Sequence, residues 1–388
     1  MTVALIAHYL GDRLGIGQYF QRLLIPLTVE LHKSSTKVKI FASPNALAKT
    51  PALQELKELV QVVPPLDYPP AQRYLWCITS FHSYCRQEGI KSVVWLSNPI
   101  VLPWHPPSLA VIHDVNEWKA KEKYGNRLKT ALRSLIYLDT SINCAKKLVA
   151  VSEATERDIF YFRPSPSIKQ KLTTIPNGAD SPLLNLPPVS INSPTNPFLL
   201  SVGRIDPVAK GLPQAVELVA KLREMSNTPW ELHLIGGMNS TTKAAGEAFL
   251  QSVADLAWVK YHGYVSDGEL AQWYRQATAI VFLSDNEGFG FPIAEAASFQ
   301  RWVVISERNQ AGIESGGEAI IVINPQESAA AASKLLSQLQ EQESPPQVSS
   351  LPQWQSAAMA YTKLINLIDF FGKSVNGEHA TGKRGGLK

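Results

Sequence analysis

The segment "SDNEGFGFPIAEAAS", residues 284–298, places two acidic residues on either side of a glycine-rich loop. Glu287 lies in the loop, and Glu295 follows about one turn into the helix expected after it. Gly288 and Gly290 free the backbone N–H groups of the loop to face a ligand. Carboxylates accept hydrogen bonds well from vicinal hydroxyls, as on a sugar or a ribose, and suit a bare phosphate badly. The segment therefore favours a polyhydroxylated ligand that also carries phosphate.

A simpler explanation accounts for part of this pattern. An acid near the N-terminus of a helix interacts favourably with the helix dipole, which explains Glu295. It leaves Glu287 and the two glycines unexplained, so ligand binding is the better interpretation of the loop.

Two cations follow an apolar run in the second half of the chain, in "SVGRIDPVAKG", residues 201–211. The expected strand ends at Gly203, and Arg204 and Lys210 flank the short loop before the next helix. Arginine grips phosphate oxygens bidentately and lysine supplies a point charge, so the pair suits a diphosphate at the crevice of an α/β sheet. Two solvated surface cations are the alternative, and this segment on its own favours that alternative.

Two segments of the first half also follow expected strands. "GIG" provides Gly15 and Gly17 between a strand and an amphipathic helix, where small residues let an anion approach backbone N–H groups. A tight turn that needs positive φ explains them equally well. "LAVIHDV", residues 109–115, places His113 and Asp114 directly after a buried strand. A histidine with a satisfied hydrogen bond near the edge of the core is the simpler explanation for His113 alone.

Apolar, β-branched runs alternate with helical stretches along the chain, which is the pattern of parallel α/β architecture. In the first half these runs are residues 3–7, 38–42, 92–97, 109–114, 147–152 and 172–177. In the second half they are residues 198–203, 231–237, 259–265, 279–284, 302–306 and 319–324. Each group is expected to form its own sheet, buried on both faces.

This arrangement predicts two Rossmann-like domains, over residues 1–180 and 198–345. Residues 181–197 are dense in Pro, Ser and Asn, have no room for a regular element, and are predicted to link the domains. Helical periodicity predicts a further helix over 354–371. The polar, glycine-rich residues 372–388 are expected to be disordered.

The composition indicates a globular protein of ordinary type. The chain has 388 residues, of which 45% are hydrophobic, enough for a large core in each domain. Its net charge of +4 falls short of a nucleic-acid-binding composition. The three cysteines lack metal-type spacing and are interpreted as structural thiols of a reducing cytoplasm. The first residues are typical of a strand and not of a signal peptide. No apolar run reaches the roughly 18 residues that span a bilayer, so we expect a soluble protein, or at most one attached to a membrane surface.

Taken in order, the segments resemble glycosyltransferase family 4, the retaining nucleotide-sugar-dependent transferases with the GT-B fold. The resemblance covers nearly the whole chain and rests on "GIGQY", "VIHD", "AVSEATERDI", "IPNGAD", "SVGRIDPVAKG", "LHLIGG", "YHGYVSDGELAQWYRQA" and "EGFGFPIAEA". The last segment contains the two glutamates of the family's signature, with seven residues between them. The resemblance implies an α/β GT-B fold of two Rossmann-like, doubly wound parallel-sheet domains that face each other across a deep cleft. It places the acceptor on the N-terminal domain, the nucleotide-sugar donor on the C-terminal domain, and the helix over 354–371 against the N-terminal domain.

The resemblance also implies residue roles. His113 would contact the donor sugar and support catalysis. Arg204 and Lys210 would neutralise the diphosphate leaving group, and Glu287 would lie near the transferred sugar. The remaining positions would bind the donor: Gly15, Gly17, Gly203, Gly236, Phe289, Gly290 and Glu295.

The chain departs from the family pattern at "SFQRWVVIS", residues 298–306, where members often carry a glycine and a proline. Phe299, Arg301 and Trp302 are bulky there. We expect this to alter the packing beneath the site and not its chemistry.

The function implied is transfer of a hexose-type sugar, with retention, from a UDP- or GDP-linked donor to a glycan, lipid-linked or small-molecule acceptor in polysaccharide or glycoconjugate biosynthesis. No metal cluster appears in the sequence, and no cofactor is expected beyond the nucleotide-sugar co-substrate. A cytoplasmic enzyme is expected. Contact with the inner face of an anionic membrane is an open alternative, because Glu117 to Lys147 carries eight Lys and Arg against three acids. A solvated helix face explains that surplus more simply.

Three other classes compete with this interpretation. One is a non-catalytic glycosyltransferase-like scaffold, and a second is a sugar-nucleotide epimerase or phosphorylase of the same fold. A dinucleotide-dependent dehydrogenase is disfavoured, because "GIGQYF" provides only the first two glycines of G-x-G-x-x-G.

Overall fold

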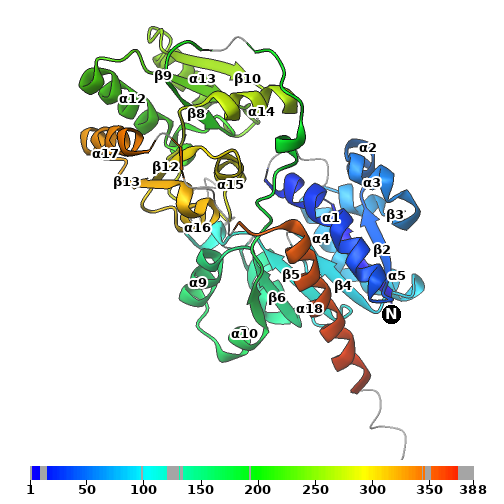
Figure 1. The fold of residues 1–388 in the computed structure, drawn as a ribbon. Coiled ribbons are helices and arrows are strands. Elements are labelled where there is room, and N and C mark those ends of the chain that lie inside the picture. The colour runs from blue at the N-terminus through cyan, green and yellow to red at the C-terminus, as the bar shows by residue number, and fades with distance from the viewer. Residues whose placement is uncertain are drawn as a thin grey trace, which may run out of the picture. The chain divides into compact units, whose positions relative to one another are not determined.

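The computed structural model describes residues 2–8, 15–97, 99–119, 131, 134–191, 194–342, 344–345 and 351–374, with backbone only from 369 onward (Figure 1). Contacts along the chain divide it into two compact units. The N-terminal unit comprises Met1–Gly178 together with Trp354–Lys388, and the C-terminal unit comprises Ala179–Gln353.

The N-terminal unit is built on a seven-stranded parallel sheet in the order β3-β2-β1-β4-β5-β6-β7. Its strands are β1 (Thr2–Ala7), β2 (Lys37–Ala42), β3 (Val60–Val62), β4 (Ser92–Trp95), β5 (Ser108–Ile112), β6 (Lys147–Ala150) and β7 (Leu172–Thr174). The chain moves outward from β1 to β3 and then returns to pair β4 on the other side of β1. The order therefore reverses beside β1, as in doubly wound sheets, where ligands bind at the carboxyl ends of the strands.

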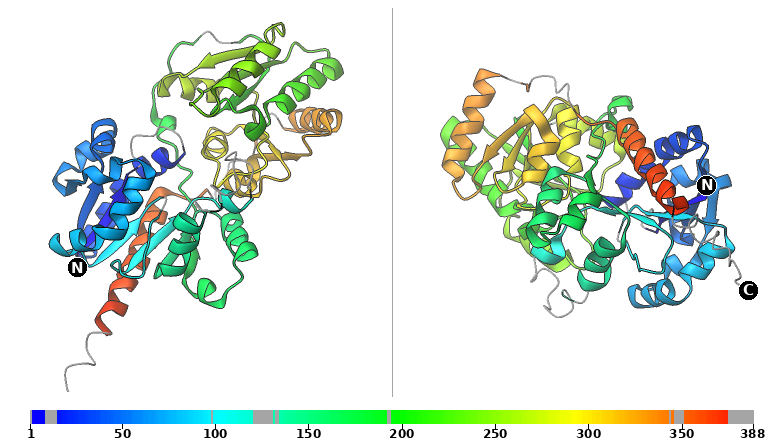
Figure 2. Two further views of the ribbon diagram at one scale, coloured as in Figure 1. Left: turned by 180° about the vertical axis from the view of Figure 1, so that it is seen from behind. Right: turned by 90° about the horizontal axis from the view of Figure 1, so that it is seen from below.

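Helices cover both faces of this sheet. They are α1 (Ile16–Lys33), α2 (Pro44–Lys49), α3 (Pro51–Glu55), α4 (Pro70–Thr79), α5 (Phe81–Gln87), α6 (Asn116–Lys119), the π-helical turn η3 (Ser134–Asp139), α8 (Thr140–Cys144), α9 (Glu153–Phe162), α10 (Pro166–Lys171) and α18 (Trp354–Ser374), with 3₁₀ turns η1 (Lys57–Leu59) and η2 (Pro64–Asp67). In α1 the buried residues recur at helical spacing, including Tyr19, Leu23 and Leu27. The last helix, α18, lies beside α1 (Figure 1, Figure 2).

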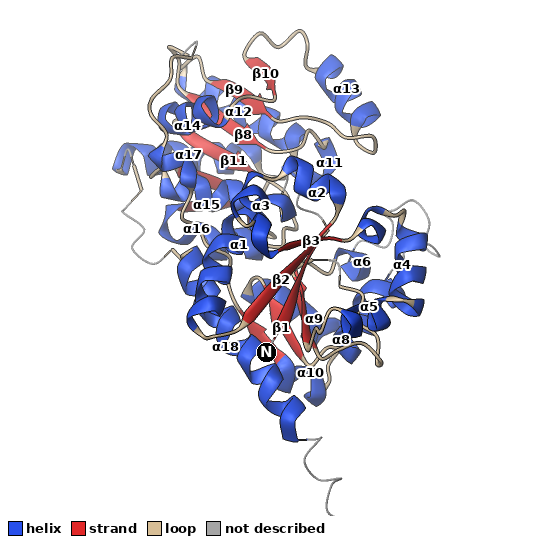
Figure 3. Cartoon of the chain, turned by 90° about the vertical axis from the view of Figure 1, so that its right-hand side faces the viewer, coloured by secondary structure: helices blue, strands red, loops and turns tan. Residues whose placement is uncertain are grey.

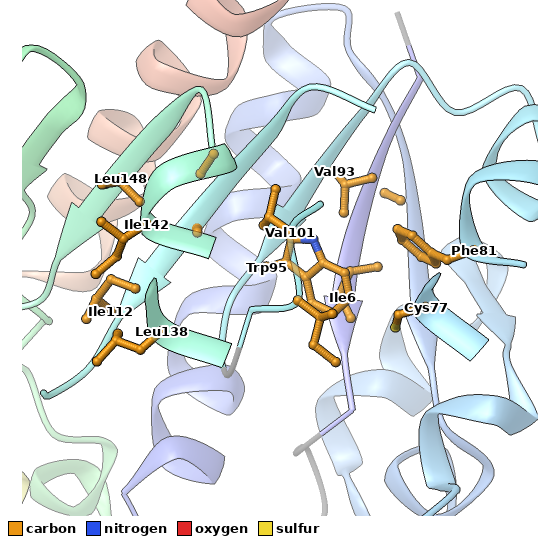
Figure 4. Close-up of a cluster of buried hydrophobic side chains, with 14 of the residues drawn as sticks. Ile6, Cys77, Phe81, Val93, Trp95, Val101, Ile112, Leu138, Ile142 and Leu148 are labelled. Carbon is orange, nitrogen blue, oxygen red and sulfur yellow. The ribbon is translucent and has the colours of Figure 1, made fainter. Parts of the chain in front are cut away.

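The opposite face of the sheet carries a large cluster of buried apolar side chains. Ile6 of β1 and Trp95 of β4 lie on this face near Cys77 of α4 and Phe81 of α5, whereas Ile112 of β5 lies nearer to Leu138 and Ile142 (Figure 4). Because side chains alternate along a strand, the two faces of the sheet receive different helices. This covering on two faces buries β4 and β5 completely and β1 from its second residue onward, as the apolar runs in the sequence indicate.

The C-terminal unit has a six-stranded parallel sheet in the order β10-β9-β8-β11-β12-β13. Its strands are β8 (Phe198–Val202), β9 (Glu231–Ile235), β10 (Val259–Gly263), β11 (Ala279–Phe282), β12 (Trp302–Ser306) and β13 (Ile320–Ile323). Its helices are α11 (Pro207–Lys210), α12 (Leu212–Ser226), α13 (Lys243–Ser252), α14 (Asp267–Gln276), α15 (Phe291–Ser298), α16 (Gln310–Gly316) and α17 (Ser328–Glu341), with η4 (Pro182–Asn185) and η5 (Gly317–Ala319) (Figure 3). Leu199 packs with α12 and α17 on one face, whereas Leu200 packs with α14 and α15 on the other.

The predicted fold class is confirmed as two Rossmann-like parallel-sheet domains. All twelve predicted runs form strands, and the structure adds β3, three residues at the edge of the first sheet. Helix α15 begins at Phe291, so Pro292 occupies its second position. Helix α18 ends at Ser374, three residues beyond the predicted end, and the predicted disordered tail from 375 lies outside the described residues.

The predicted linker, residues 181–197, contains a regular element, contrary to expectation. The side chain of Ser181 accepts a hydrogen bond from the N–H of Leu183, and Pro182 takes the first position of the turn η4. Leu183 is buried, and η4 packs on α14. A capped proline turn therefore fixes this segment to the C-terminal unit. In the part of the chain that the structure describes, no helix is both long and apolar enough to cross a membrane.

Candidate active site

An ion pair brings together two of the predicted site residues in the C-terminal unit. Nζ of Lys210, at the end of α11, lies 2.6 Å from Oε1 of Glu287 in the loop after β11. Each side chain is 20% exposed, so the pair is partly shielded from water and open on one side. The Lys210 ammonium also lies 4.8 Å from the centre of the Phe282 ring. The cation predicted for a diphosphate and the acid predicted for a sugar are thus adjacent and hold each other in place.

Arg204 is oriented by a carboxylate that the sequence analysis did not single out. Its Nη2 lies 3.2 Å from Oδ2 of Asp206. The other oxygen of Asp206 accepts the N–H of Ala209 and caps α11, where Pro207 occupies the first position. Nε of Arg204 is buried and forms no hydrogen bond within the described residues. The sequence signal for this role was present, since Asp followed by Pro predicts a helix start.

Gly203 and Gly236 end the neighbouring strands β8 and β9 in conformations that L side chains rarely adopt. Their φ angles are +146° and +137°. A Cβ added to Gly236 would overlap the carbonyl oxygen of Gly203. The N–H of Gly203 donates to the carbonyl oxygen of Ile235 at 2.9 Å, so the two strand ends are held close together. A Cβ at Gly203 would meet Cε of Lys210 at 3.9 Å. The two glycines therefore form a bare stretch of backbone beside the Lys210 side chain, as close approach of a ligand to the backbone requires.

The glycine-rich loop before α15 presents backbone and not side chains. Gly290 immediately precedes the helix with φ +93°, and no side chain caps the first turn. Phe289 is only 6% exposed, and its ring packs edge-on against Phe291 at 5.3 Å. Its side chain is therefore committed to the core, which leaves backbone N–H groups as the donors that this loop can offer.

Glu295 is 2% exposed and lies inside the C-terminal unit. The hydroxyl of Tyr274, from α14, donates to Oε2 of Glu295 at 3.1 Å. The ring of Tyr274 in turn stacks on Phe299 at 5.3 Å with an interplanar angle of 14°. Phe299 is one of the bulky residues of 298–306, and through this stack it packs on the tyrosine that donates to Glu295.

His113 lies at the end of β5 in the N-terminal unit and is partly buried. Its Nε2–H donates to the carbonyl of Leu96 at 2.8 Å, which fixes the neutral tautomer and leaves Nδ1 as an acceptor. No described residue forms a hydrogen bond with Nδ1. Burial lowers the pKa of His113 from its ordinary value of 6.5 to about 4, and the hydrogen bond to Leu96 opposes this only in part. The imidazole is therefore neutral at pH 7.

The two glycines of "GIG" lie at the start of α1. Gly15 precedes the helix with φ +40°, and a Cβ there would meet nothing within 4 Å. Gly17 is buried in the first turn. The loop residues 9–14 that precede them lie outside the described residues, so the predicted approach of this loop to a diphosphate stays a prediction.

One exposed aromatic residue at the same edge of the C-terminal sheet was not predicted. Tyr264 directly follows β10 and is 65% exposed, yet its ring lies so close to Gly237 that a Cβ there would overlap it. One face of the ring therefore rests on backbone at the end of β9, while much of the residue stays open to solvent. In the sequence, two adjacent glycines end one apolar run at 236–237, and a glycine followed by a tyrosine ends the next run at 263–264. This pattern could have indicated an aromatic ring resting on glycine backbone.

Comparisons with known proteins agree with this architecture. Residues 196–341 match the family model described as "Glycosyl transferases group 1". The chain is 26% identical over 242 residues to O-antigen chain mannosyltransferase B of Escherichia coli, an alignment that covers 60% of this chain and 61% of that protein. The match thus spans about three-fifths of the length of this curated relative.

Solved structures resemble nearly the whole chain. Sucrose-phosphate synthase (tll1590) of Thermosynechococcus elongatus has a TM-score of 0.63 at 17% identity and covers 97% of this chain and 100% of that one. Anabaena Alr3699/HepE in complex with UDP and glucose has a TM-score of 0.62 at 15% identity, with 97% and 100% covered. UDP-GlcNAc 2-epimerase of Methanocaldococcus jannaschii has a TM-score of 0.56 at 13% identity, with 95% and 100% covered. These likenesses establish the fold class as GT-B, a class that also contains an epimerase.

Replacing Gly236 by Ala should destabilise the C-terminal unit by about 3 kcal/mol or more. The added Cβ overlaps the Gly203 carbonyl, and the φ of +137° adds backbone strain. Gly263→Ala is the matched control in the same unit, because its φ is +66° and its Cβ would meet only the Tyr261 hydroxyl, at 4.0 Å. That control should cost about 1–2 kcal/mol. Urea unfolding of both variants measures the difference, and equal losses would contradict the close approach.

The burial of His113 makes the stability of the N-terminal unit depend on pH. Because the pKa of His113 in the folded chain, about 4, lies below the ordinary value of 6.5, its contribution is complete above pH 6.5 and is lost as the pH falls toward 4. His113→Gln can still donate to the Leu96 carbonyl but does not titrate. The urea midpoint of the wild type should therefore fall further between pH 7.5 and pH 4.5 than that of the variant. Equal falls would show that His113 is not buried as the structure describes.

Proposed function

We propose that the protein is a retaining glycosyltransferase that moves a hexose-type sugar from a UDP- or GDP-linked donor to a glycan, lipid-linked or small-molecule acceptor, in polysaccharide or glycoconjugate biosynthesis. The observation that carries this proposal is the ion pair between Lys210 and Glu287, which brings a cation and an acid together at the carboxyl edge of the C-terminal sheet. Arg204 follows β8 and Lys210 ends α11, whereas Glu287 and Glu295 follow β11. All four lie within the residues that match group 1 glycosyl transferases.

The names of similar proteins support the same class. The curated relative is an O-antigen chain mannosyltransferase, and one similar structure holds UDP and glucose. For the present chain, the donor base, the sugar and the retention of configuration belong to the proposal.

Binding of the donor would rearrange the Lys210–Glu287 pair. A diphosphate carries more negative charge than one carboxylate, so it would take Nζ of Lys210 and leave the oxygens of Glu287 to accept sugar hydroxyls. The buried Nε of Arg204, which has no partner among the described residues, would gain one from a phosphate oxygen. The backbone at Gly203, Gly236 and the loop of Phe289 and Gly290 would supply further N–H donors.

In the transfer step the bond between the anomeric carbon and the phosphate oxygen breaks, and a bond to the acceptor oxygen forms on the same face. The acceptor proton goes to the leaving phosphate oxygen. Arg204 and Lys210 would stabilise the charge that grows on the diphosphate. His113, neutral and with Nδ1 available, would accept a hydrogen bond from a hydroxyl of the donor sugar, and Glu295 would hold the ribose hydroxyls. No metal enters this scheme, and no group of three His, Cys, Asp or Glu side chains is arranged to hold one in the described ranges.

The acceptor is proposed to bind the N-terminal unit, on the implication of the resemblance, with Gly15 and Gly17 near the diphosphate. A cytoplasmic location and a peripheral contact with an anionic membrane also remain proposals. Five of the eight Lys and Arg residues that motivate the membrane contact lie outside the described residues, which leave out 120–130 and 132–133.

Release of nucleoside diphosphate separates the competing classes. Release that depends on an added acceptor indicates transfer, and release with inorganic phosphate alone indicates a phosphorylase. Interconversion of the donor sugar without an acceptor indicates an epimerase, a chemistry found in one protein of similar fold. A non-catalytic scaffold releases nothing. A thermal-shift panel of nucleoside-diphosphate sugars identifies the donor beforehand, because a bound donor stabilises the folded state.

Alanine at Arg204 or at Lys210 should lower kcat at least tenfold, since a lost charge contact in the transition state is worth about 1.5–3 kcal/mol. Lys221→Ala is the matched control, because Lys221 pairs with Glu224 on the exposed surface of α12 in the same unit. Initial rates of nucleoside diphosphate release at saturating donor measure the effect. Turnover near that of the wild type in both site variants would remove the diphosphate assignment.

Tyr264 is proposed to stack on the base of the donor. It lies two strand spacings, about 10 Å, from the end of β8, which places an aromatic face beyond the diphosphate region. Tyr264→Ala should raise KM for the donor roughly tenfold, because stacking on an aromatic residue contributes about 1–3 kcal/mol. Tyr264→Phe should retain the wild-type KM, since the ring alone provides the stacking. A KM unchanged in the alanine variant would place the base elsewhere.

A further inference from the structure

A hydrogen bond between two buried tyrosines joins the first and last long helices of the N-terminal unit. The hydroxyl of Tyr19 on α1 donates to that of Tyr361 on α18 at 2.9 Å, although the two residues are 342 positions apart. Tyr19 is 0% and Tyr361 1% exposed. Burial raises the pKa of both phenols, so both hydroxyls stay protonated. Each hydroxyl therefore depends on the other for a hydrogen bond that water does not supply.

The ring of Tyr19 lies directly against the imidazole of His113. Their ring centres are 4.6 Å apart and their planes meet at 85°, an edge-to-face contact. Trp354, the first residue of α18, makes a second edge contact with Tyr19 at 5.8 Å and 63°. Residues of α18 therefore hold the Tyr19 ring on one side, and on its other side the ring contacts the imidazole of His113.

The contact matters because the side chain of His113 has one hydrogen bond among the described residues. Among the described residues only the Leu96 carbonyl holds this ring by a hydrogen bond, so how far the ring can swing about its Cβ–Cγ bond depends on packing. The edge of Tyr19 restricts this swing, and so restricts the direction in which the Nδ1 lone pair points. A displacement of Tyr19 would misdirect Nδ1 without breaking the bond to Leu96.

We propose that Tyr361 is a positioning residue that acts on His113 through Tyr19, so that the C-terminal helix α18 helps to set the geometry of the reaction. The inference rests on the proposed function, because it takes His113 to be a group that touches the donor sugar. Tyr361 itself touches no substrate. Its effect passes through the hydrogen bond between the Tyr361 and Tyr19 hydroxyls and then through the contact of the Tyr19 ring with His113. Both contacts lie within the N-terminal unit.

The test compares Tyr361→Phe with a variant that loses a different hydrogen bond to the same helix. Thr36→Val is this matched control, because Oγ1 of Thr36 donates to Asn366 of α18 at 3.2 Å and lies outside the Tyr19 contacts. Tyr361→Phe leaves the Tyr19 hydroxyl buried without its partner, which displaces the ring. The double variant Tyr19→Phe with Tyr361→Phe removes both hydroxyls, so neither is left buried without a partner and the ring at position 19 can keep its edge contact with His113. This variant remains informative if the single variant folds poorly.

We expect kcat to fall about tenfold in Tyr361→Phe with KM for the donor unchanged, because a small misplacement of a catalytic group affects the reaction more than binding. The control should stay within about twofold of the wild type, and the double variant should regain most of the lost rate. The proton–carbon NMR signal of the His113 imidazole, identified by its loss in His113→Gln, should move in Tyr361→Phe and stay in place in Thr36→Val.

Two results would overturn the inference in distinguishable ways. If His113→Ala abolishes transfer while Tyr361→Phe and Thr36→Val have the same kcat and the same His113 signal, Tyr361 has no positioning role and the proposed function stands. If His113→Ala transfers sugar at the wild-type rate, the catalytic assignment of His113 fails, and the effect of Tyr361 on turnover fails with it, whatever the NMR signal shows.

Discussion

The ion pair between Lys210 and Glu287 fixes the geometry on which the proposed donor site depends. It joins two loops that follow different strands of one sheet, with Nζ and Oε1 2.6 Å apart. Each side chain is one-fifth exposed, so water screens part of the attraction while both charges have lost part of their hydration, and the net gain in stability is small. The consequence of the pair is orientation. The ammonium is held at the sheet edge before a ligand arrives, and in the proposed scheme the exchange of Glu287 for a phosphate oxygen leaves it beside the charge that develops on the diphosphate.

The backbone beside this pair has a conformation that would let a ligand approach it closely. At the ends of β8 and β9, Gly203 and Gly236 adopt backbone angles that other residues rarely adopt, and their lack of side chains keeps the surface beside Lys210 bare. Asp206 completes the arrangement, since one carboxylate both caps α11 and holds the guanidinium of Arg204. Cations, exposed backbone and helix starts then meet at one edge because all six strands are parallel.

The sequence was sufficient for the features that depend on local pattern. Apolar runs predicted twelve strands. The strand β3 was not predicted, because its three residues at the edge of the sheet are too few to give a periodic pattern. The positions of the site residues at the ends of strands also followed from the sequence, although their roles came from the family resemblance. What could not be predicted depends on residues distant in sequence: the pairing of Lys210 with Glu287 and the bond between Tyr19 and Tyr361 each need the folded chain.

Phe299, one of the bulky residues in 298–306, packs on the residue that holds the buried Glu295. A carboxylate that is 2% exposed needs hydrogen bonds from the protein, since its burial without them would be costly. Tyr274 provides one, and the direction of its hydroxyl depends on where its ring packs. Phe299 supplies a flat surface for that ring, and the guanidinium of Arg275 also lies near Phe299, 5.5 Å from the centre of its ring. A glycine at this position would give the ring of Tyr274 no surface to stack on, so Phe299 helps to hold the hydroxyl that donates to Glu295.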